Sequence, residues 1–274
     1  MANDDGIALI GGGQMALAMA DGFCRAGLVV PPAIVVSDPS PDARERLATR
    51  LPGIRFAASN AEAAAAAPLV LLAVKPQQAA AACHDIGGAL GPGAVVVSIV
   101  AGLSTSSLAS LLGMPRVIRV MPNTPCLVGK GVSAICATDA VTPEQFARAK
   151  MLLAAVGTVH EVPEPLMDAV TGVSGSGPGF VAMFVEALVA GGVEAGLSER
   201  LALTLAVETI AGTAALIAQT GESPAVIRER VCSPGGTTLA GLAAMERGGV
   251  RTGISAGVVA ARDRARELGR ADSQ

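Results

Sequence analysis

The stretch Ile7-Ala8-Leu9-Ile10-Gly11-Gly12-Gly13-Gln14-Met15-Ala16 decides the fold of the amino-terminal half. Its four leading apolar residues predict a buried strand, and the apolar pattern over residues 14–25 predicts a helix. A strand, a G-x-G-x-x-A turn and a helix in this order are typical of a dinucleotide-binding βαβ unit. Gly11 would make the turn, Gly13 would let a pyrophosphate approach the backbone, and the small Ala16 would let helix and strand pack closely. The alternative is a tight turn without a ligand.

Strand and helix patterns continue to alternate as far as residue 161. Further strands are expected at residues 33–37, 54–58, 69–74, 94–100, 116–121, 132–136 and 157–161. Helices are expected at residues 61–67, 77–86 and 143–156, and from a cap at Ser104 or Thr105 to Leu112. Continuous runs of Val, Ile, Leu and Ala between helices indicate a buried parallel sheet, in which ligands bind beyond the carboxyl ends of the strands. We therefore expect an α/β, Rossmann-type domain over residues 1–164.

The end of the second strand, Ser37-Asp38-Pro39-Ser40, is where such folds meet the adenosine ribose of the cofactor. Asp38 favours NAD, because a carboxylate accepts from both ribose hydroxyls and repels a 2′-phosphate. Residues that suit the 2′-phosphate of NADP are also present, namely Ser37, Ser40, Arg44 and Asn60. The pattern leaves both cofactors open.

No convincing strand follows residue 165. Ser174-Gly175-Ser176-Gly177 is interpreted as a hinge, and Pro178 suits the first turn of the long apolar helix that follows. Further helices are expected at residues 199–220, 224–231, 237–247 and 251–268. We therefore expect an all-helical second domain over residues 165–274. Apolar helices in so short a domain favour completion by a partner subunit.

The stretch Cys232-Ser233-Pro234-Gly235-Gly236-Thr237-Thr238 joins two of these helices. Its glycines leave backbone N–H groups bare at a helix start, where the first N–H groups have no internal partner and the helix dipole is positive. A carboxylate or phosphate could bind there without Lys or Arg. A Pro-Gly turn capped by a Thr explains the same residues without a ligand.

The composition of the 274 residues argues against several classes of protein. A formal net charge of −3, no Trp, no Tyr and only five Phe argue against nucleic-acid binding. The long apolar stretches are broken by glycines or carry Glu186 and Glu194, so no membrane span is expected. The acidic start, Met1-Ala2-Asn3-Asp4-Asp5, does not resemble an export signal, and five scattered cysteines favour neither disulfides nor a metal site. We expect a cytoplasmic protein without a metal.

The inventory of proton-transferring side chains narrows the reaction. Residues 161–274 contain neither His nor Lys, so the second domain offers no base for an alcohol-forming dehydrogenase. His84 and His160 are expected to be exposed or locally satisfied. Reduction of a C=N bond needs no strong protein base, because the imine can arrive protonated. The protein has then to hold a carboxylate, orient the ring and place one hydroxyl near the nitrogen.

Five motifs together resemble those of pyrroline-5-carboxylate reductases and span nearly the full length. They are Gly-Gly-Gly-Gln-Met-Ala at residues 11–16, Ala-Val-Lys-Pro at 73–76, Met-Pro-Asn-Thr-Pro at 121–125, Gly-Val-Ser-Gly-Ser-Gly-Pro at 172–178 and Cys-Ser-Pro-Gly-Gly-Thr-Thr at 232–238. In that family a Rossmann domain binds NADPH, and an all-helical domain interlocks with its partner. The resemblance implies reduction of 1-pyrroline-5-carboxylate to proline by a homodimer, which can assemble further into a decamer.

The resemblance also implies roles for individual residues. The N–H groups of Gly235, Gly236 and Thr237 would bind the substrate carboxylate, and the Thr238 hydroxyl would orient the ring nitrogen and donate a proton. The pocket wall would be formed by Val173, Ser174, Gly175, Ser176 and Gly177. Residues implied to bind the cofactor are Gly11, Gly13, Gln14, Met15, Ala16, Ser37, Asp38, Asn60, Ala73, Val74, Lys75, Pro76, Ala101, Gly102 and Leu103. NADPH is the implied cofactor, with NADH as the alternative.

Two other functions are open. A reductase of another small imino or keto acid, such as a two-domain hydroxyacid dehydrogenase, would use the same scaffold, although the missing His and Lys argue against an alcohol-forming member. A catalytically silent dinucleotide sensor would need the glycine turn but not the loop at residues 232–238. Imine reduction is the hypothesis that uses both features.

Overall fold

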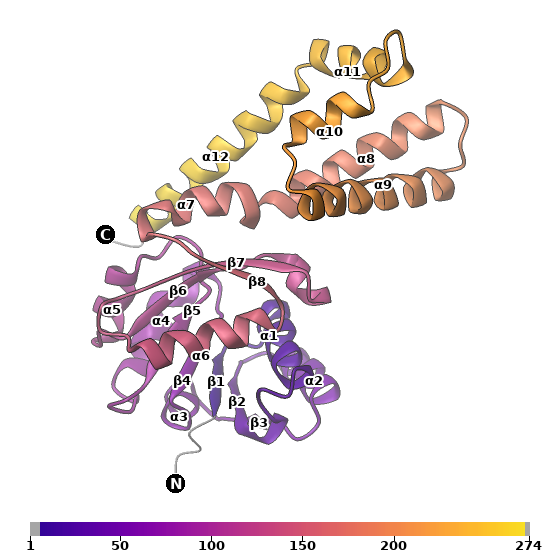
Figure 1. Cartoon of the computed structure of the whole chain (residues 1–274). Helices are drawn as coiled ribbons and strands as arrows, with labels where there is room; N and C mark the ends of the chain where they lie inside the picture. Colours follow the sequence, from indigo (N-terminus) through magenta and orange to yellow (C-terminus); the bar gives the residue numbers. More distant parts are fainter. Residues whose placement is uncertain (1–5, 272–274) are drawn as a thin grey trace. The chain divides into compact units, whose positions relative to one another are not determined.

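The computed structural model of the chain describes residues 6–271 (Figure 1). The acidic start, expected not to be an export signal, lies outside these residues. Contacts divide the chain into two compact units. Unit 1 comprises the described residues up to Ser176 and those from Ala260 onward, and unit 2 comprises Gly177–Val259. The expected domain boundary after residue 164 stays a prediction.

Unit 1 is built on an eight-stranded sheet with the strand order β3-β2-β1-β4-β5-β6-β7-β8. The strands are β1 Ile7–Ile10, β2 Ile34–Ser37, β3 Arg55–Phe56, β4 Leu69–Leu72, β5 Val95–Ser98, β6 Val117–Met121, β7 Gly131–Ala137 and β8 Gly157–Glu161. Strands β1 to β6 are parallel to one another. β7 runs antiparallel to β6, and β8 is parallel to β7. This mostly parallel sheet confirms the expected α/β, Rossmann-type fold.

Helices cover both faces of the sheet (Figure 1). One core includes α1 Gln14–Arg25, α2 Pro41–Arg50 and α6 Pro143–Ala154, and the other includes α3 Asn60–Ala65, α4 Pro76–Gly87 and α5 Thr105–Leu112. Side chains alternate along each strand, so Leu9 packs into the first core and Ile10 into the second. Burial on both faces explains why these strands are continuous apolar runs.

Helix α2 is not among the elements expected from the sequence. It buries only Ala43 and Leu47, so it lacks a broad apolar stripe. The signals that mark it are at its start. The Ser40 hydroxyl oxygen accepts from the Ala43 N–H at 3.3 Å, and Pro41 occupies the first helical turn.

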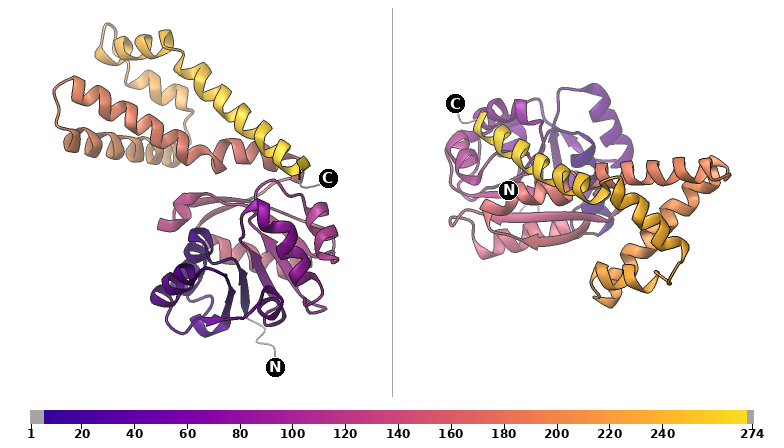
Figure 2. Two further views of the ribbon diagram at one scale, coloured as in Figure 1. Left: turned by 180° about the vertical axis from the view of Figure 1, so that it is seen from behind. Right: turned by 90° about the horizontal axis from the view of Figure 1, so that it is seen from above.

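Unit 2 is helical throughout its secondary structure, as expected, and residues 177–259 contain no strand. Its helices are α8 Gly177–Glu194, α9 Glu199–Thr220, α10 Pro224–Arg230 and α11 Thr237–Arg247. Helix α12, Val250–Ala271, belongs to unit 2 as far as Val259. α8 and α9 lie side by side as a hairpin (Figure 2). No side chain is buried in α8 or α11, and in α9 only Ala202 and Ala206 are. In a single chain, the other apolar side chains of α8, α9 and α11 are therefore partly or fully exposed, whereas Ile227 of α10 is buried.

Two helical stretches, Glu164–Glu194 and Glu199–Thr220, are long and apolar enough to cross a membrane by length and composition alone. Exposed side chains on them include Met183, Leu203 and Leu205. A helix that is apolar on all sides has to be covered by protein or by lipid. These helices need a cover that a single chain does not supply.

Candidate active site

The glycine turn at residues 11–16 joins β1 to α1. Gly11 has a φ of +95°, and a Cβ there would lie 2.7 Å from the carbonyl oxygen of Ala73, so the position requires glycine. Gly13 is the N-cap of α1, where no side chain caps the helix. A Cβ on Gly13 would meet nothing within 4 Å, and Ala16 is fully buried. The first N–H groups of α1 can therefore be approached closely, which suits a pyrophosphate.

The carboxylate of Asp38 is tied to this turn. One of its oxygens accepts from the Gly12 N–H at 2.6 Å, and the other accepts from the Ser40 N–H at 2.8 Å. The carbonyl of Ser37 accepts from the Gly11 N–H at 2.9 Å. The end of β2 and the glycine turn are thus joined by two hydrogen bonds, and the Asp38 carboxylate lies where the adenosine ribose is expected.

The loop after β4 lies beside the glycine turn, and the loop after β5 follows the neighbouring parallel strand. The Ala73 N–H donates to the Ile10 carbonyl at 2.8 Å. Gly102 has a φ of +88°, and a Cβ there would lie 3.2 Å from the backbone nitrogen of Gly269 in α12. The carboxyl ends of neighbouring parallel strands share one edge of the sheet. Contacts of residues 73–76 and 101–103 with a cofactor stay a prediction.

Several of the expected cofactor residues have partners within the chain. The Asn60 side-chain amide donates to Asp85 at 3.0 Å. Met15 accepts a contact from the Cys126 thiol, with 3.1 Å between the sulfurs. Lys75 is exposed and is the N-cap of α4. These side chains are placed by the fold before any ligand is present, and their roles toward a cofactor stay predictions.

The boundary between the two compact units falls after Ser176, within the expected hinge at residues 174–177, but the backbone there is largely helical, and a hinge function stays a prediction. Thr171–Gly175 is a π-helical turn that connects α7, Met167–Val170, directly to α8. The Ser176 N–H donates to the Thr171 carbonyl at 2.8 Å, which is the i to i−5 spacing of a π-helix. Ser and Gly are typical of loops, but here the backbone stays helical and bonds with the wider i to i−5 spacing. Such turns are often found at functional sites.

The loop before α11 ends in a helix start without a side-chain cap. Gly236 is the N-cap and Thr237 is the first helical residue, so Thr237 is not the cap. Gly235 has a φ of +69°, which favours glycine. The Gly236 N–H donates to the Ser233 carbonyl at 2.9 Å, whereas those of Gly235 and Thr237 have no acceptor among the described residues. The Thr238 side chain is half-buried. Binding of a carboxylate here stays a prediction.

A buried arginine in β6 was missed by the sequence analysis. Arg119 is only 7% exposed, and its guanidinium lies 3.4 Å from Glu164 and 3.3 Å from Asp168. Glu164 also accepts from the N–H and the hydroxyl of Thr105 at the start of α5, both at 2.6 Å. Two carboxylates thus satisfy the buried charge. A charged residue inside an apolar strand run is the signal that would have found it.

Asn123, which follows β6, was quoted in a motif but given no role. It is 8% exposed. Its side-chain N–H donates to the Ser174 carbonyl at 3.1 Å, and its side-chain oxygen accepts from the Val132 N–H at 2.8 Å. The partners lie 51 and 9 residues away in the chain, and no local pattern reveals such pairs.

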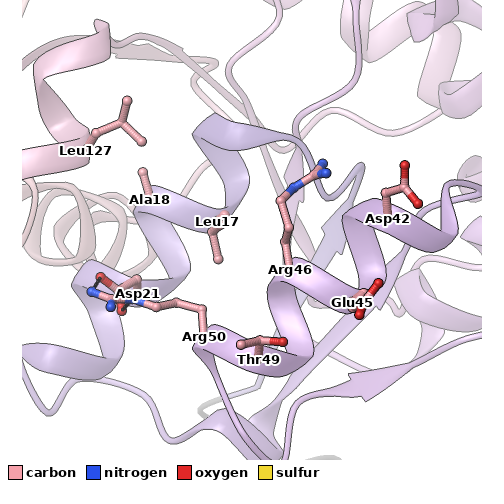
Figure 3. A pocket seen from close by; sticks show the side chains of 9 residues that line it. All are labelled: Leu17, Ala18, Asp21, Asp42, Glu45, Arg46, Thr49, Arg50 and Leu127. Carbon is pink, nitrogen blue, oxygen red and sulfur yellow. Dashed lines mark hydrogen bonds and ion pairs between the residues drawn. The ribbon is translucent and has the colours of Figure 1, made fainter.

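A hollow lies between α1 and α2 (Figure 3). Asp21 and Arg50 pair across it, with 2.8 and 3.0 Å between their polar atoms. The lining also carries Asp42, Glu45 and Arg46, so both signs of charge are mixed. None of the residues that line the hollow is among the expected binding residues.

Metal and histidine chemistry have little support in the part of the chain that the structure describes. No three His, Cys, Asp or Glu side chains gather there as a metal site. His84 and His160 are both exposed. Burial raises the pKa of the Cys83 and Cys136 thiols to about 11, and Glu164 adds to the effect at Cys136. These thiols are poor nucleophiles at neutral pH.

Comparisons with known proteins agree over both halves of the chain. Residues 164–268 match the family described as pyrroline-5-carboxylate reductase dimerisation, and residues 6–102 match NADP oxidoreductase coenzyme F420-dependent. The chain is 46% identical to the pyrroline-5-carboxylate reductase of a Synechocystis strain, over 96% of this chain and 98% of that protein. It is 38% identical to that of Arabidopsis thaliana, over 96% and 95%.

A solved structure supports the same relationship. The structure of Plasmodium falciparum pyrroline carboxylate reductase with NADP bound superimposes with a TM-score of 0.89 at 29% identity, over 98% of this chain and 99% of that one. The dimerisation match identifies the helical half as a region of homo-oligomerisation. Because the similarity spans both halves, the chain belongs to the pyrroline-5-carboxylate reductase family and is an NAD(P)H-dependent oxidoreductase.

Proposed function

We propose that this chain reduces the C=N bond of 1-pyrroline-5-carboxylate to give L-proline. The observation that carries the proposal is the 46% identity to a pyrroline-5-carboxylate reductase over nearly the full length of both proteins. A bound reduced nicotinamide would supply the hydride that adds to the imine carbon. The electron pair of the C=N bond then goes to the nitrogen, which is neutral in the product if the imine arrived protonated.

Unit 1 would hold the cofactor. The uncapped start of α1, with open space at Gly13, fits a pyrophosphate. Ser37, Asp38 and Asn60 would meet the adenosine ribose, and the loops after β4 and β5 would border the nicotinamide. We propose NADPH, because the Plasmodium falciparum structure with NADP bound shares the fold. NADH is the alternative, since the Asp38 carboxylate is fixed beside the turn by two backbone N–H groups.

The substrate would be held by uncharged groups. We propose that the N–H groups of Gly235, Gly236 and Thr237 bind its carboxylate, with that of Gly236 shared with Ser233. The Thr238 hydroxyl would orient the ring nitrogen: it accepts from the N–H of a protonated imine, whereas with a neutral imine it would donate its proton to the nitrogen and take another from solvent. Residues 173–177 would wall the pocket. No basic side chain is required, because a helix start attracts anions through its free N–H groups and its dipole.

The assembly would be a homodimer, in which a second copy covers the exposed apolar helices of unit 2. Family membership and the dimerisation match support protein rather than lipid as this cover. We further propose that dimers can assemble into decamers and that the protein works in the cytoplasm, away from membranes and nucleic acids.

A spectrophotometric assay tests the function. The purified protein is mixed with NADPH or NADH and pyrroline-5-carboxylate, absorbance of the reduced nicotinamide is followed, and proline is identified in the product. We expect oxidation of the cofactor only when the imine is present. Oxidation with keto acids alone would point to a hydroxyacid dehydrogenase, and no oxidation with any substrate would point to a dinucleotide sensor.

A further inference from the structure

One face of β6 and of the two residues that follow it contacts the segment at residues 164–176. Arg119 pairs with Glu164 and Asp168. Met121 reaches Gly175, where an added Cβ would lie 2.4 Å from the methionine Cε. Asn123 donates to Ser174. Positions two apart share one face of extended chain, while Ile118 and Val120 between them pack into the main core. The segment is therefore held against β6 and the residues after it, near its start by Arg119 and near its end by Met121 and Asn123.

The Ser174 carbonyl has a specific need for a donor. In an α-helix it would accept from the N–H of the residue four places on, but that residue is Pro178, which has none. The carbonyl belongs to the π-helical turn Thr171–Gly175. Ser174 is half-buried, so its carbonyl needs a partner from the protein or from water. The Asn123 amide supplies the missing N–H from outside the helix, at 3.1 Å.

The Asn123 amide is itself held in place. Its oxygen accepts from the Val132 N–H at 2.8 Å at the start of β7, and the side chain is 8% exposed. With one end bonded to the sheet and the other to Ser174, the amide has a single orientation. The amide therefore ties the π-helical turn to the edge of the sheet.

We propose that Asn123 is a positioning residue of the reductase, which fixes the turn around Ser174 in the place that substrate binding requires. This inference rests on the proposed function of residues 173–177 as the wall of the substrate pocket. Asn123 acts through Ser174 and need not touch the substrate. Its loss should therefore weaken substrate binding and leave the cofactor site intact.

The variant Asn123→Asp removes the donor and keeps the acceptor for the Val132 N–H. At pH 8 the introduced carboxylate faces the Ser174 carbonyl without a hydrogen, so we expect KM for pyrroline-5-carboxylate to rise about tenfold or more. The dissociation constant for NADPH should stay within about twofold of wild type, because its proposed site is elsewhere. The chain has no Trp or Tyr, so nicotinamide fluorescence is read with little protein background.

Lowering the pH gives a readout that a general loss of stability would not reproduce. Once protonated, the introduced carboxyl has an O–H that can donate to the Ser174 carbonyl. The ratio of kcat/KM in the variant to that in wild type should rise as the pH falls from 8 toward 5, since burial raises a carboxyl pKa into this range. Thr124→Ala, at the exposed neighbouring position, is the matched control and should change neither constant.

If folded Asn123→Asp has the same kcat/KM as wild type at pH 8, the inference is overturned. A reduced kcat/KM that does not recover as the pH falls would also overturn it. If that variant does not fold, Asn123→Ala is combined with Pro178→Ala, which returns an N–H four residues after Ser174. We expect a folded protein whose KM is still raised, because the carbonyl is satisfied but not tied to the sheet. Unchanged KM there would also overturn the inference. Failure of the proposed function is distinguishable, since wild type itself would then be inactive with the imine.

Discussion

The two compact units differ in how far they bury their apolar side chains. In unit 1, Leu9, Ile10 and Leu72 are fully buried between a sheet and its covering helices. In unit 2, Leu203 is 48% and Leu205 46% exposed, and α8 has no buried residue. Unit 1 therefore contains its own core, whereas unit 2 exposes apolar side chains that another molecule would have to cover. The part of the chain that matches the dimerisation family thus includes the unit that leaves its apolar helices uncovered in a single copy.

The largest effect is expected from a charge on the exposed apolar face of unit 2. Leu205→Arg should weaken the dimer about 1000-fold, because each of two symmetric copies would lose about 2 kcal/mol or more on burying a charge. Sedimentation at micromolar concentration measures this shift toward monomer. Val30→Arg is the matched control, since Val30 is a 62% exposed apolar residue of unit 1. An unchanged dimer in Leu205→Arg would contradict the comparison.

The next effect separates the proposed roles of the two units. Thr238→Ala should lower kcat about 10- to 100-fold, the worth of one well-placed donor, with little change in NADPH affinity. Steady-state kinetics and nicotinamide fluorescence measure the two quantities. Thr238→Ser keeps a hydroxyl and should recover most of the activity. Equal losses of turnover and cofactor affinity would indicate a structural role instead.

A smaller change is expected from Asp38 in unit 1. Asp38→Ser removes a fixed negative charge, so the ratio of kcat/KM for NADPH to that for NADH should rise about tenfold. It also removes the acceptor of the Gly12 N–H, so both cofactors should bind somewhat less well. Asp42→Ser, which removes an exposed carboxylate from the first turn of α2, is the control. A constant ratio would mean that Asp38 only holds the turn.

The smallest effect concerns the buried thiols of unit 1. The folded pKa of Cys83 is about 11, against an ordinary value of 9.0. The unfolded chain loses this proton between pH 9 and 11 while the folded chain keeps it, so the stability contribution is full below pH 9 and falls as the pH rises. We expect a loss of about 1 kcal/mol per thiol at pH 10. Urea unfolding of wild type and Cys83→Ala measures it, and equal pH slopes in the two would contradict the assignment.

Much of unit 1 could be predicted from the sequence because its signals are local. Continuous apolar runs bounded by glycine or proline gave β1, β4 and β5 within a few residues, and the long helix α9 was placed without error. Helix α2 was missed because its apolar stripe is narrow. The candidate site was predicted largely through resemblance, and its residue roles stay predictions.

The errors and omissions have a common physical cause. Residues 174–177 were interpreted as a hinge because serine and glycine usually form loops, and the i to i−5 bonding of the turn at residues 171–175 has no sequence signature. Arg119 and Asn123 went without roles because their partners lie far along the chain. Hydrogen bonds and ion pairs between distant segments depend on the folded geometry, which local patterns do not report.

The contact between Glu164 and the start of α5 has a consequence for selectivity. Like α1, this helix begins just beyond the carboxyl end of a parallel strand, and its first N–H would attract phosphate. The chain fills that position with its own carboxylate, bonded to Thr105 at 2.6 Å. Glu164 thus occupies the anion position at the start of α5, whereas the start of α1 carries no side-chain cap and can accept a phosphate.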